Sequence, residues 1–164
     1  MDFTTLSESE LLQLHAGVIE ELHSRGVVRT ANNPVGDYTE WLVCDRLSLS
    51  LQPNSKASYD GIDANGLRYQ IKGRRSKPGN VQLSVIRNLD QVGFDYLVAV
   101  VFNSDYTIRF AAKIPHSVVS AIATYRKHVN GHVPIIRESV LQRIGVEDIT
   151  SILNAPKLSS ELSQ

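Results

Sequence analysis

The chain has 164 residues, a length that suits one domain with a buried core. Its 17 basic and 17 acidic residues cancel, which excludes a protein that attracts nucleic acid by net charge alone. The single Cys44 excludes an internal disulfide, the segment MDFTTLSESE is too polar for a signal peptide, and the longest apolar run, Leu97 to Phe102, is too short to span a bilayer. We expect a single cytoplasmic domain over residues 1–154, with no membrane segment, and a polar tail over residues 155–164.

A first helix is predicted between Ser7 and Gly26. Ser7 and Glu10 have the spacing of a capping box, and Gly26 is a typical C-terminal stop. Apolar residues recur along this segment at helical spacing, at Leu11, Leu14, Val18 and Leu22. Capping and turn roles are favoured over substrate contact for the polar residues that follow, which are Arg29, Thr30, Asn32 and Asn33.

A second helix is predicted from the N-cap Asn33, with proline next to it at the first helical position, to about Leu47. Helical periodicity puts Glu40 on the apolar stripe with Cys44, away from the face that carries Thr39. A carboxylate on an apolar stripe needs a partner. Metal ligation is the favoured interpretation; a misplaced surface Glu and a buried ion pair with an Arg are the alternatives.

A β-hairpin is predicted around the segment Asp63-Ala64-Asn65-Gly66. Asp at the first position and Gly at the last are typical of a type I turn that ends in a left-handed bulge residue. This turn pairs Asp60 with Gln70, and Lys72 then lies on the same side of the strand as Gln70. A two-residue turn at Asn65-Gly66 would instead pair Asp60 with Ile71 and send Gln70 to the other side. Convergence of the polar side chains therefore requires the bulged turn.

These side chains suit the hydrolysis of a phosphodiester, which needs stabilisation of negative charge and activation of water. A hard cation held by oxygen ligands supplies both. Glu40 and Asp60 carry two negative charges, which match one Mg²⁺ or Mn²⁺, while Gln70 and the carbonyl of Ile71 offer neutral oxygen ligands. Lys72 is expected to stabilise the scissile phosphate or to orient the attacking water.

A run of basic residues extends from this predicted strand. It has five basic residues and no acidic one between positions 68 and 77, namely Arg68, Lys72, Arg74, Arg75 and Lys77. Such a strand end suits contacts with phosphates of a nucleic-acid backbone. The alternative is an ordinary solvated edge strand.

The remaining segments predict a continuing α/β pattern. A short strand at residues 81–83 precedes a helix of about two turns from Ser84 to near residue 93, and two strands follow at residues 94–102 and 107–114. A further helix is expected from Pro115 to about Lys127. One or two C-terminal helices are then expected to pack back through Leu141, Ile144, Val146 and Ile149.

Residues 33–115 resemble the PD-(D/E)XK nuclease superfamily, which includes restriction endonucleases and Holliday-junction resolvases. The resemblance rests on the helical Glu40, on Asp60 before a short hairpin, on Gln70-Ile71-Lys72 and on the basic extension Gly73-Arg74-Arg75. The sequence departs from the usual pattern in having Gln70 where a carboxylate is common, and Tyr59 instead of proline before Asp60.

The resemblance implies a restriction-endonuclease-like mixed β-sheet with core order α-β-β-β-α-β, here with an extra N-terminal helix and a C-terminal helical tail. It also implies an Mg²⁺- or Mn²⁺-dependent endonuclease acting on nucleic acid, with DNA as the expected substrate, in restriction, phage defence or DNA processing. Glu40, Asp60, Gln70 and Lys72 would form its catalytic site, and Arg68, Arg74, Arg75 and Lys77 would bind the nucleic acid. A homodimer, or a partner protein in such a complex, is compatible with this role. The alternative is a protein that keeps the fold without efficient cleavage and acts as a nucleic-acid-binding or complex-forming subunit.

Overall fold

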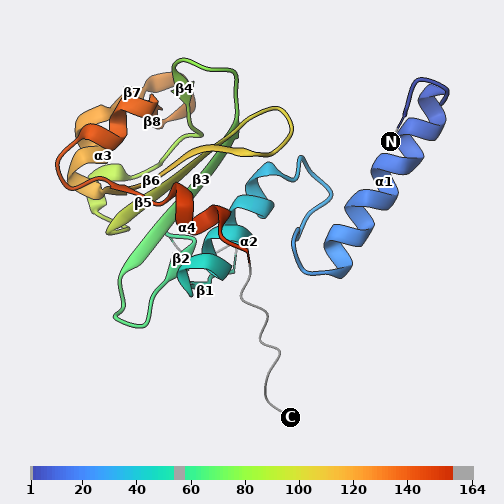
Figure 1. Cartoon of the computed structure of the whole chain (residues 1–164). Coiled ribbons are helices and arrows are strands. Elements are labelled where there is room, and N and C mark those ends of the chain that lie inside the picture. Colours follow the sequence, from blue (N-terminus) through green and yellow to red (C-terminus); the bar gives the residue numbers. More distant parts are fainter. Residues whose placement is uncertain (1, 54–57, 157–164) are drawn as a thin grey trace, which may run out of the picture.

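The computed structural model describes residues 2–53 and 58–156. This part of the chain forms a mixed α/β fold with four α-helices, a six-stranded sheet and a smaller three-stranded sheet (Figure 1). None of the helices described there combines the length and apolar character needed to cross a membrane.

The six-stranded sheet has the order β1-β2-β3-β5-β6-β9. Its strands are β1 (Ser50–Leu51), β2 (Gly61–Ile62), β3 (Arg68–Arg75), β5 (Tyr96–Phe102), β6 (Ile108–Pro115) and β9 (Glu147–Asp148). β3 and β5 pair in parallel, while every other neighbouring pair is antiparallel. The central strands β3 and β5 therefore require a crossover connection, which residues 76–95 provide.

Both faces of this sheet are covered. Along β5, Leu97, Ala99 and Val101 pack on one face, and Val98 and Val100 pack on the other, as the two-residue period of a strand dictates. The second face is covered by α2 (Val35–Leu47) and α4 (Thr150–Asn154). Burial on both sides explains why β5 is an uninterrupted apolar run.

The first face is covered by α3 (His116–Ile122) and the smaller sheet. That sheet has the order β4-β8-β7 and consists of β4 (Val81–Gln82), β8 (Gly131–Ile136) and β7 (Ala123–Arg126).

The helix predicted from Ser84 to residue 93 is absent, which corrects the expected α-β-β-β-α-β order. Only a 3-10 turn forms, at Leu89–Gln91, between Asn88 and Val92, whose φ angles of 53° and 48° lie in the left-handed region. Ile86 instead forms an isolated antiparallel bridge with His132. The segment extends toward β8 because pairing there satisfies its backbone and buries its apolar side chains.

The helix predicted to reach Lys127 ends at Ile122, five residues earlier. The residues that follow form β7, which pairs antiparallel with β8. β7 contains the β-branched Thr124 and the aromatic Tyr125, residue types that favour strands. Pairing with β8, a strand that the sequence interpretation did not anticipate, therefore overrode the helical pattern.

The C-terminal segment packs back only in part as predicted. Ile149 is buried, and Leu141 and Val146 lie against the core, but Ile144 is 98% exposed. Residues 157–164, most of the predicted polar tail, lie outside the described residues.

The N-terminal helix α1 (Glu8–Ser24) has the predicted capping box: the Ser7 hydroxyl accepts from the Glu10 N–H at 3.4 Å, and the Ser7 N–H donates to Glu10 Oε2 at 2.8 Å. Helix α2 begins at Val35, whose N–H donates to Asn33 Oδ1 at 3.1 Å, and it ends at Leu47 as predicted. Figure 1 shows α1 at one side of the molecule and α2 lying along the sheet.

Helix α2 approaches β3 closely at Gly73. A Cβ on Gly73 would overlap Thr39 Oγ1 and lie 2.8 Å from Thr39 Cβ. Thr39 is completely buried, so its predicted place on the outward face of the helix was wrong. The helix turns this residue toward the sheet because only glycine opposite it leaves room.

We expect Gly73→Ala to lower the free energy of unfolding by about 1–3 kcal/mol, since the added methyl has no space. Chemical denaturation of purified protein would measure this loss. Gly36→Ala is the matched control on α2, because its Cβ would meet nothing within 4 Å, and the helix propensity of alanine should leave stability unchanged or raise it by up to about 1 kcal/mol. Equal stability of the two variants would contradict the close approach.

Candidate functional site

The hairpin between β2 and β3 has the predicted bulged turn. Gly66 has a φ of +83°, and its N–H donates to the Asp63 carbonyl at 3.1 Å. Asp63 Oδ1 accepts from the N–H groups of Asn65 and Leu67, both at 2.9 Å. Gly61 consequently pairs with Tyr69, and this register sets Asp60 opposite Gln70. The two-residue alternative turn is excluded.

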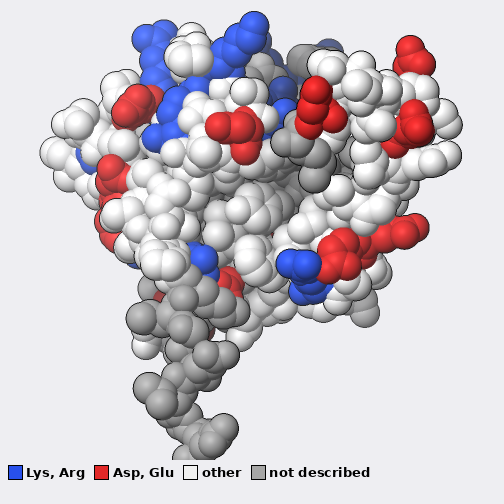
Figure 2. Space-filling view, turned by 45° about the vertical axis from the view of Figure 1, so that its right-hand side comes forward, with Lys and Arg blue, Asp and Glu red and all other residues white. Residues whose placement is uncertain are grey.

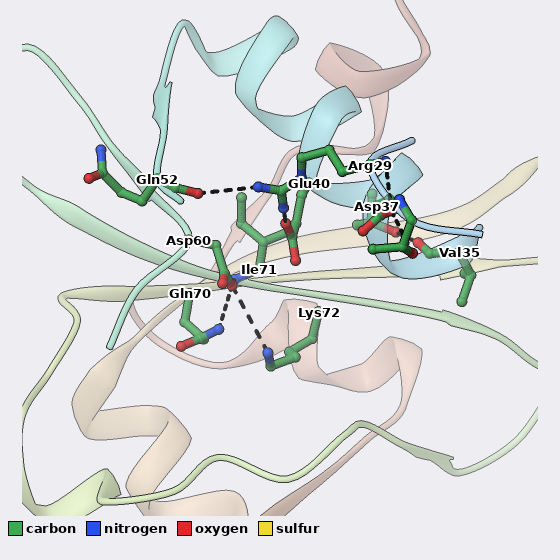
Figure 3. Close-up of polar contacts among 11 residues, drawn as sticks. Arg29, Val35, Asp37, Glu40, Gln52, Asp60, Gln70, Ile71 and Lys72 are labelled. Atoms are coloured by element: carbon green, nitrogen blue, oxygen red, sulfur yellow. Dashed lines mark hydrogen bonds and ion pairs between the residues drawn. The ribbon is translucent and has the colours of Figure 1, made fainter. Parts of the chain in front are cut away.

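Asp60, Gln70 and Lys72 lie together at the end of this hairpin (Figure 3). Asp60 Oδ2 accepts from Gln70 Nε2 and, at 2.6 Å, from the Ile71 N–H, while Lys72 Nζ lies 4.0 Å away. The Ile71 N–H is open to Asp60 because β2 begins only at Gly61. Because β2 is short, part of the edge of β3 has no strand partner, and the Asp60 carboxylate lies against that part.

Glu40 enters the same region from α2. Its carboxylate forms an ion pair with Arg29, whose Nη1 also donates to the Gln52 carbonyl at 3.3 Å (Figure 3). Both side chains are mostly buried. The buried Glu–Arg pair was one of the open alternatives for Glu40, but the sequence did not identify Arg29 as the partner.

The segment before α2 is anchored by Asp37. Asp37 Oδ2 accepts from the N–H of Arg29 at 2.8 Å, from the N–H of Thr30 at 2.8 Å and from its hydroxyl at 3.0 Å. These bonds hold the backbone from which Arg29 reaches Glu40. Asp37 was not singled out from the sequence, although an acidic residue in the first helical turn is a known signal for capping interactions.

Partial burial and the neighbouring charges shift the pKa values of two groups in this cluster. Burial, together with the charge of Asp60, raises the pKa of Glu40 to about 7, although Arg29 and Lys72 oppose the shift. Burial, followed by the charges of Glu40 and Asp60, likewise raises the pKa of the nearby Cys44 thiol to about 11. The two carboxylates therefore interact beside β3, and basic side chains partly balance their charge.

The oxygen atoms available for a cation come from α2 and from the β2–β3 hairpin. Asp60 Oδ1, Glu40 Oε1 and Gln70 Oε1 accept no hydrogen bond from any described residue. The Ile71 carbonyl points to the same edge as its N–H, as in any strand residue. Residues 2–53 and 58–156 contain no group of three His, Cys, Asp or Glu residues able to hold a metal, so a cation here would depend on Gln70 and backbone oxygen as well as the two carboxylates.

The predicted basic residues fall into two groups. Arg68 is committed to Asp95, to which its Nε and Nη2 donate, both at 3.0 Å. Arg74, Arg75 and Lys77 are exposed, with the Arg75 guanidinium 4.6 Å from the centre of the Tyr106 ring. Figure 2 shows basic side chains gathered at the upper end of the molecule, the height at which the β3–β4 loop lies in Figure 1.

Arg109 joins this end of the sheet from β6, since its Nη1 donates to the Ser76 carbonyl at 2.9 Å. The sequence interpretation missed Arg109 because β6 comes near the end of β3 only through β5, which pairs with both strands.

A polar pocket of about 430 Å³ adjoins the cluster. Gln70 and Arg68 form one wall, and Arg87, Asn88 and Gln91 form another. The side chains of this second wall make no hydrogen bond or ion pair with any residue in the described part of the chain. The pocket therefore presents donors and acceptors beside Gln70.

Sequence comparison finds no match to a protein-family model and no significant match to a curated protein. A functional assignment therefore rests on the residues and on their geometry.

The raised pKa of Glu40 predicts a pH-dependent stability in metal-free protein. Between pH 4.5, the ordinary value for Glu, and about 7, the native carboxyl keeps a proton that the unfolded chain releases, so the free energy of unfolding falls as pH rises. Denaturation in a chelator across this range, compared with Glu40→Gln, would measure the effect. We expect a shallower decline in the variant; identical slopes would show that Glu40 titrates normally.

Proposed function

We propose that this protein is a divalent-metal-dependent nuclease that hydrolyses phosphodiester bonds of nucleic acid, with DNA as the expected substrate. The observation that carries the proposal is the meeting of Asp60 with Gln70 and Lys72 on β3, with Glu40 facing them from α2. Two interacting carboxylates beside a lysine, at the edge of a pocket, are a combination that suits phosphoryl chemistry better than core packing.

The arrangement of elements supports a restriction-endonuclease-like reading of the sheet. Helix α2 is followed by β1, β2 and β3 as antiparallel neighbours, and β5 then pairs with β3 in parallel. This order agrees with the α-β-β-β-α-β core except for its second helix, whose position in the chain is taken by β4 and the 3-10 turn. We therefore propose a variant of that fold in which the small sheet does the covering.

The oxygen donors fit an Mg²⁺ or Mn²⁺ ion. Glu40, Asp60, the Gln70 amide oxygen and the Ile71 carbonyl are all hard ligands, and two of them are negatively charged. Gln70 would have to turn its amide, because its nitrogen now faces Asp60. A bound metal would polarise the scissile phosphate and lower the pKa of a bound water.

Lys72 and Arg29 have different roles in the proposed site. Lys72, held near Asp60, is placed to stabilise charge on the phosphate or to orient the attacking water. Arg29 neutralises Glu40 in the metal-free protein, so it must loosen that pair when a cation binds to the carboxylate. The guanidinium would then be free to contact a substrate phosphate.

We expect metal-dependent cleavage of DNA that is abolished by Asp60→Ala or by Lys72→Ala, since each removes a group from the reacting site. A nuclease assay with Mg²⁺ or Mn²⁺ would measure this, with circular dichroism to verify folding. Lys127→Ala, a change at an exposed lysine outside the cluster, is the matched control and should retain full activity. Undiminished cleavage by purified Asp60→Ala protein would exclude this site.

A second candidate is a nuclease-fold protein that binds nucleic acid, or joins a complex, without cleaving. It is favoured by the contacts within the cluster, which give both carboxylates partners without a metal ion. Arg29 pairs with Glu40, and Gln70 and Ile71 donate hydrogen bonds to Asp60. Nucleic-acid binding by the wild-type protein with no cleavage in either metal would support this candidate over the first.

In both candidates the exposed end formed by Arg74, Arg75 and Lys77 would contact backbone phosphates. We expect the triple alanine variant to bind DNA more weakly, with a log–log salt slope flatter by about one unit per lost contact. Fluorescence anisotropy over a salt series would measure the slope. Alanine at the exposed Arg126 and Lys127 is the control for simple loss of charge, and an unchanged slope in the triple variant would place the nucleic acid elsewhere.

A further inference from the structure

The polar pocket beside Gln70 is formed largely by the crossover segment that joins β3 to β5. Gln70 and Arg68 line it from β3, and most of its other lining residues lie at positions 85–93. Its volume of about 430 Å³ is in the range of pockets that hold small organic ligands. Gln70 also donates to Asp60, so the pocket lies directly beside the carboxylate cluster.

The backbone of the crossover wall is anchored at two points. The Ile86 N–H donates to the His132 carbonyl at 2.8 Å, and the His132 N–H donates to the Ile86 carbonyl at 2.9 Å. The carbonyl of the buried Leu89 lies 2.9 Å from His116 Nε2. Val92 has a left-handed φ of 48°, which a β-branched residue adopts only where its surroundings impose it. The fold therefore holds this wall in a defined shape.

The wall carries three polar side chains that have no hydrogen-bond or ion-pair partner in residues 2–53 or 58–156. They are Arg87, Asn88 and Gln91, and all three are exposed. No acidic side chain from the described part of the chain lines the pocket. The wall thus offers one cationic donor and two amides, each of which can both donate and accept.

Apolar side chains line the same pocket, namely Val85, Ile86 and Val92. Apolar groups beside amides and a guanidinium match a nucleobase, which has flat apolar faces and a hydrogen-bonding edge. Asn and Gln side chains form paired hydrogen bonds with adenine, and Arg forms them with guanine, so a purine is the best match. A base stacked within a duplex cannot enter a concave pocket, and the base must therefore lie outside the stack.

We propose that this pocket binds an unpaired purine base of the nucleic acid, next to the phosphate held at the cluster of Asp60 and Lys72. The inference rests on the proposed function, because it names the form of nucleic acid that the same site accepts. An unpaired base enters without the cost of breaking a base pair. The protein should therefore prefer DNA with an unpaired purine over a fully paired duplex.

Fluorescence anisotropy with three labelled duplexes, in EDTA so that no strand is cut, tests this preference. One duplex is fully paired, one has a single unpaired adenine, and one has an abasic nucleotide in place of that adenine. We expect the adenine duplex to bind about tenfold more tightly than the other two, the effect of one paired contact to a base. Equal affinity for the adenine and abasic duplexes overturns the proposal, because the protein would then detect a flexible backbone instead of a base.

Variants of the wall test which side chains read the base. Arg87→Ala with Gln91→Ala should lower the affinity for the adenine duplex to that for the abasic duplex. Both side chains are exposed and unpaired within the described chain, so circular dichroism and the denaturation midpoint should be unchanged. Arg126→Ala with Gln82→Ala is the matched control, which removes the same two residue types from exposed positions outside the pocket and should keep the preference. A preference that survives the first pair of changes, or that the control pair abolishes, overturns the proposal.

Cleavage is measured separately, with Mg²⁺ or Mn²⁺, so that the two proposals can fail independently. Cleavage of DNA without a preference for the unpaired adenine supports the nuclease and overturns the base pocket. The preference without cleavage supports the base pocket in a protein that binds nucleic acid and does not cut it.

Discussion

The contact between Thr39 on α2 and Gly73 on β3 is the constraint on which the site depends. Because Gly73 has no side chain, the helix rests directly on the strand, and a single methyl group there would overlap the threonine hydroxyl. Glu40 follows Thr39 in the helix, and Lys72 precedes Gly73 in the strand, so the same approach brings the helical carboxylate to the strand that carries Gln70 and Lys72. β3 can act as this platform because β5 pairs with it from Tyr69 to Arg75, which is all of the strand except its first residue.

Charge balance explains how such a cluster survives partial burial. Two carboxylates taken out of water repel each other and lose hydration, which is why the pKa of Glu40 rises to about 7. The positive charges of Arg29 and Lys72 offset part of this repulsion and lost hydration. The N–H of Ile71 and the amide of Gln70 donate hydrogen bonds to the Asp60 carboxylate. The cluster is therefore stable without a ligand while it still offers unused carboxylate oxygens. Asp37 supports the cluster indirectly, because it accepts hydrogen bonds from the backbone of the segment that carries Arg29.

The three-stranded sheet helps to cover the face of the six-stranded sheet on which the sequence predicted a helix. The parallel pairing of β3 and β5 requires a long connection, and a helix is the usual element in it. Here that connection supplies β4, Ile86 and Leu89, which pack with β8 and α3 on the same core. Either solution buries the first face of the sheet. The strand solution also leaves Arg87, Asn88 and Gln91 at the edge of the pocket beside Gln70, where a regular helix would have turned part of this segment elsewhere.

Local signals in the sequence determined the features that depend on neighbours in the chain. The capping box of α1, the bounds of α2, the bulged turn at Gly66 and the pairing of Asp60 with Gln70 all follow from hydrogen bonds or backbone angles within a few residues. The strands β5 and β6 were also predictable, because long apolar runs between turn residues have few alternatives. Tertiary structure decided the rest. Ile86 and the strands β7 and β8 formed no helix because distant segments offered them backbone partners, and Thr39 turned inward because glycine lay opposite it. Only the folded chain selects Arg29 as the partner of Glu40, since the energy of that pair depends on burial and on a segment that Asp37 holds in place.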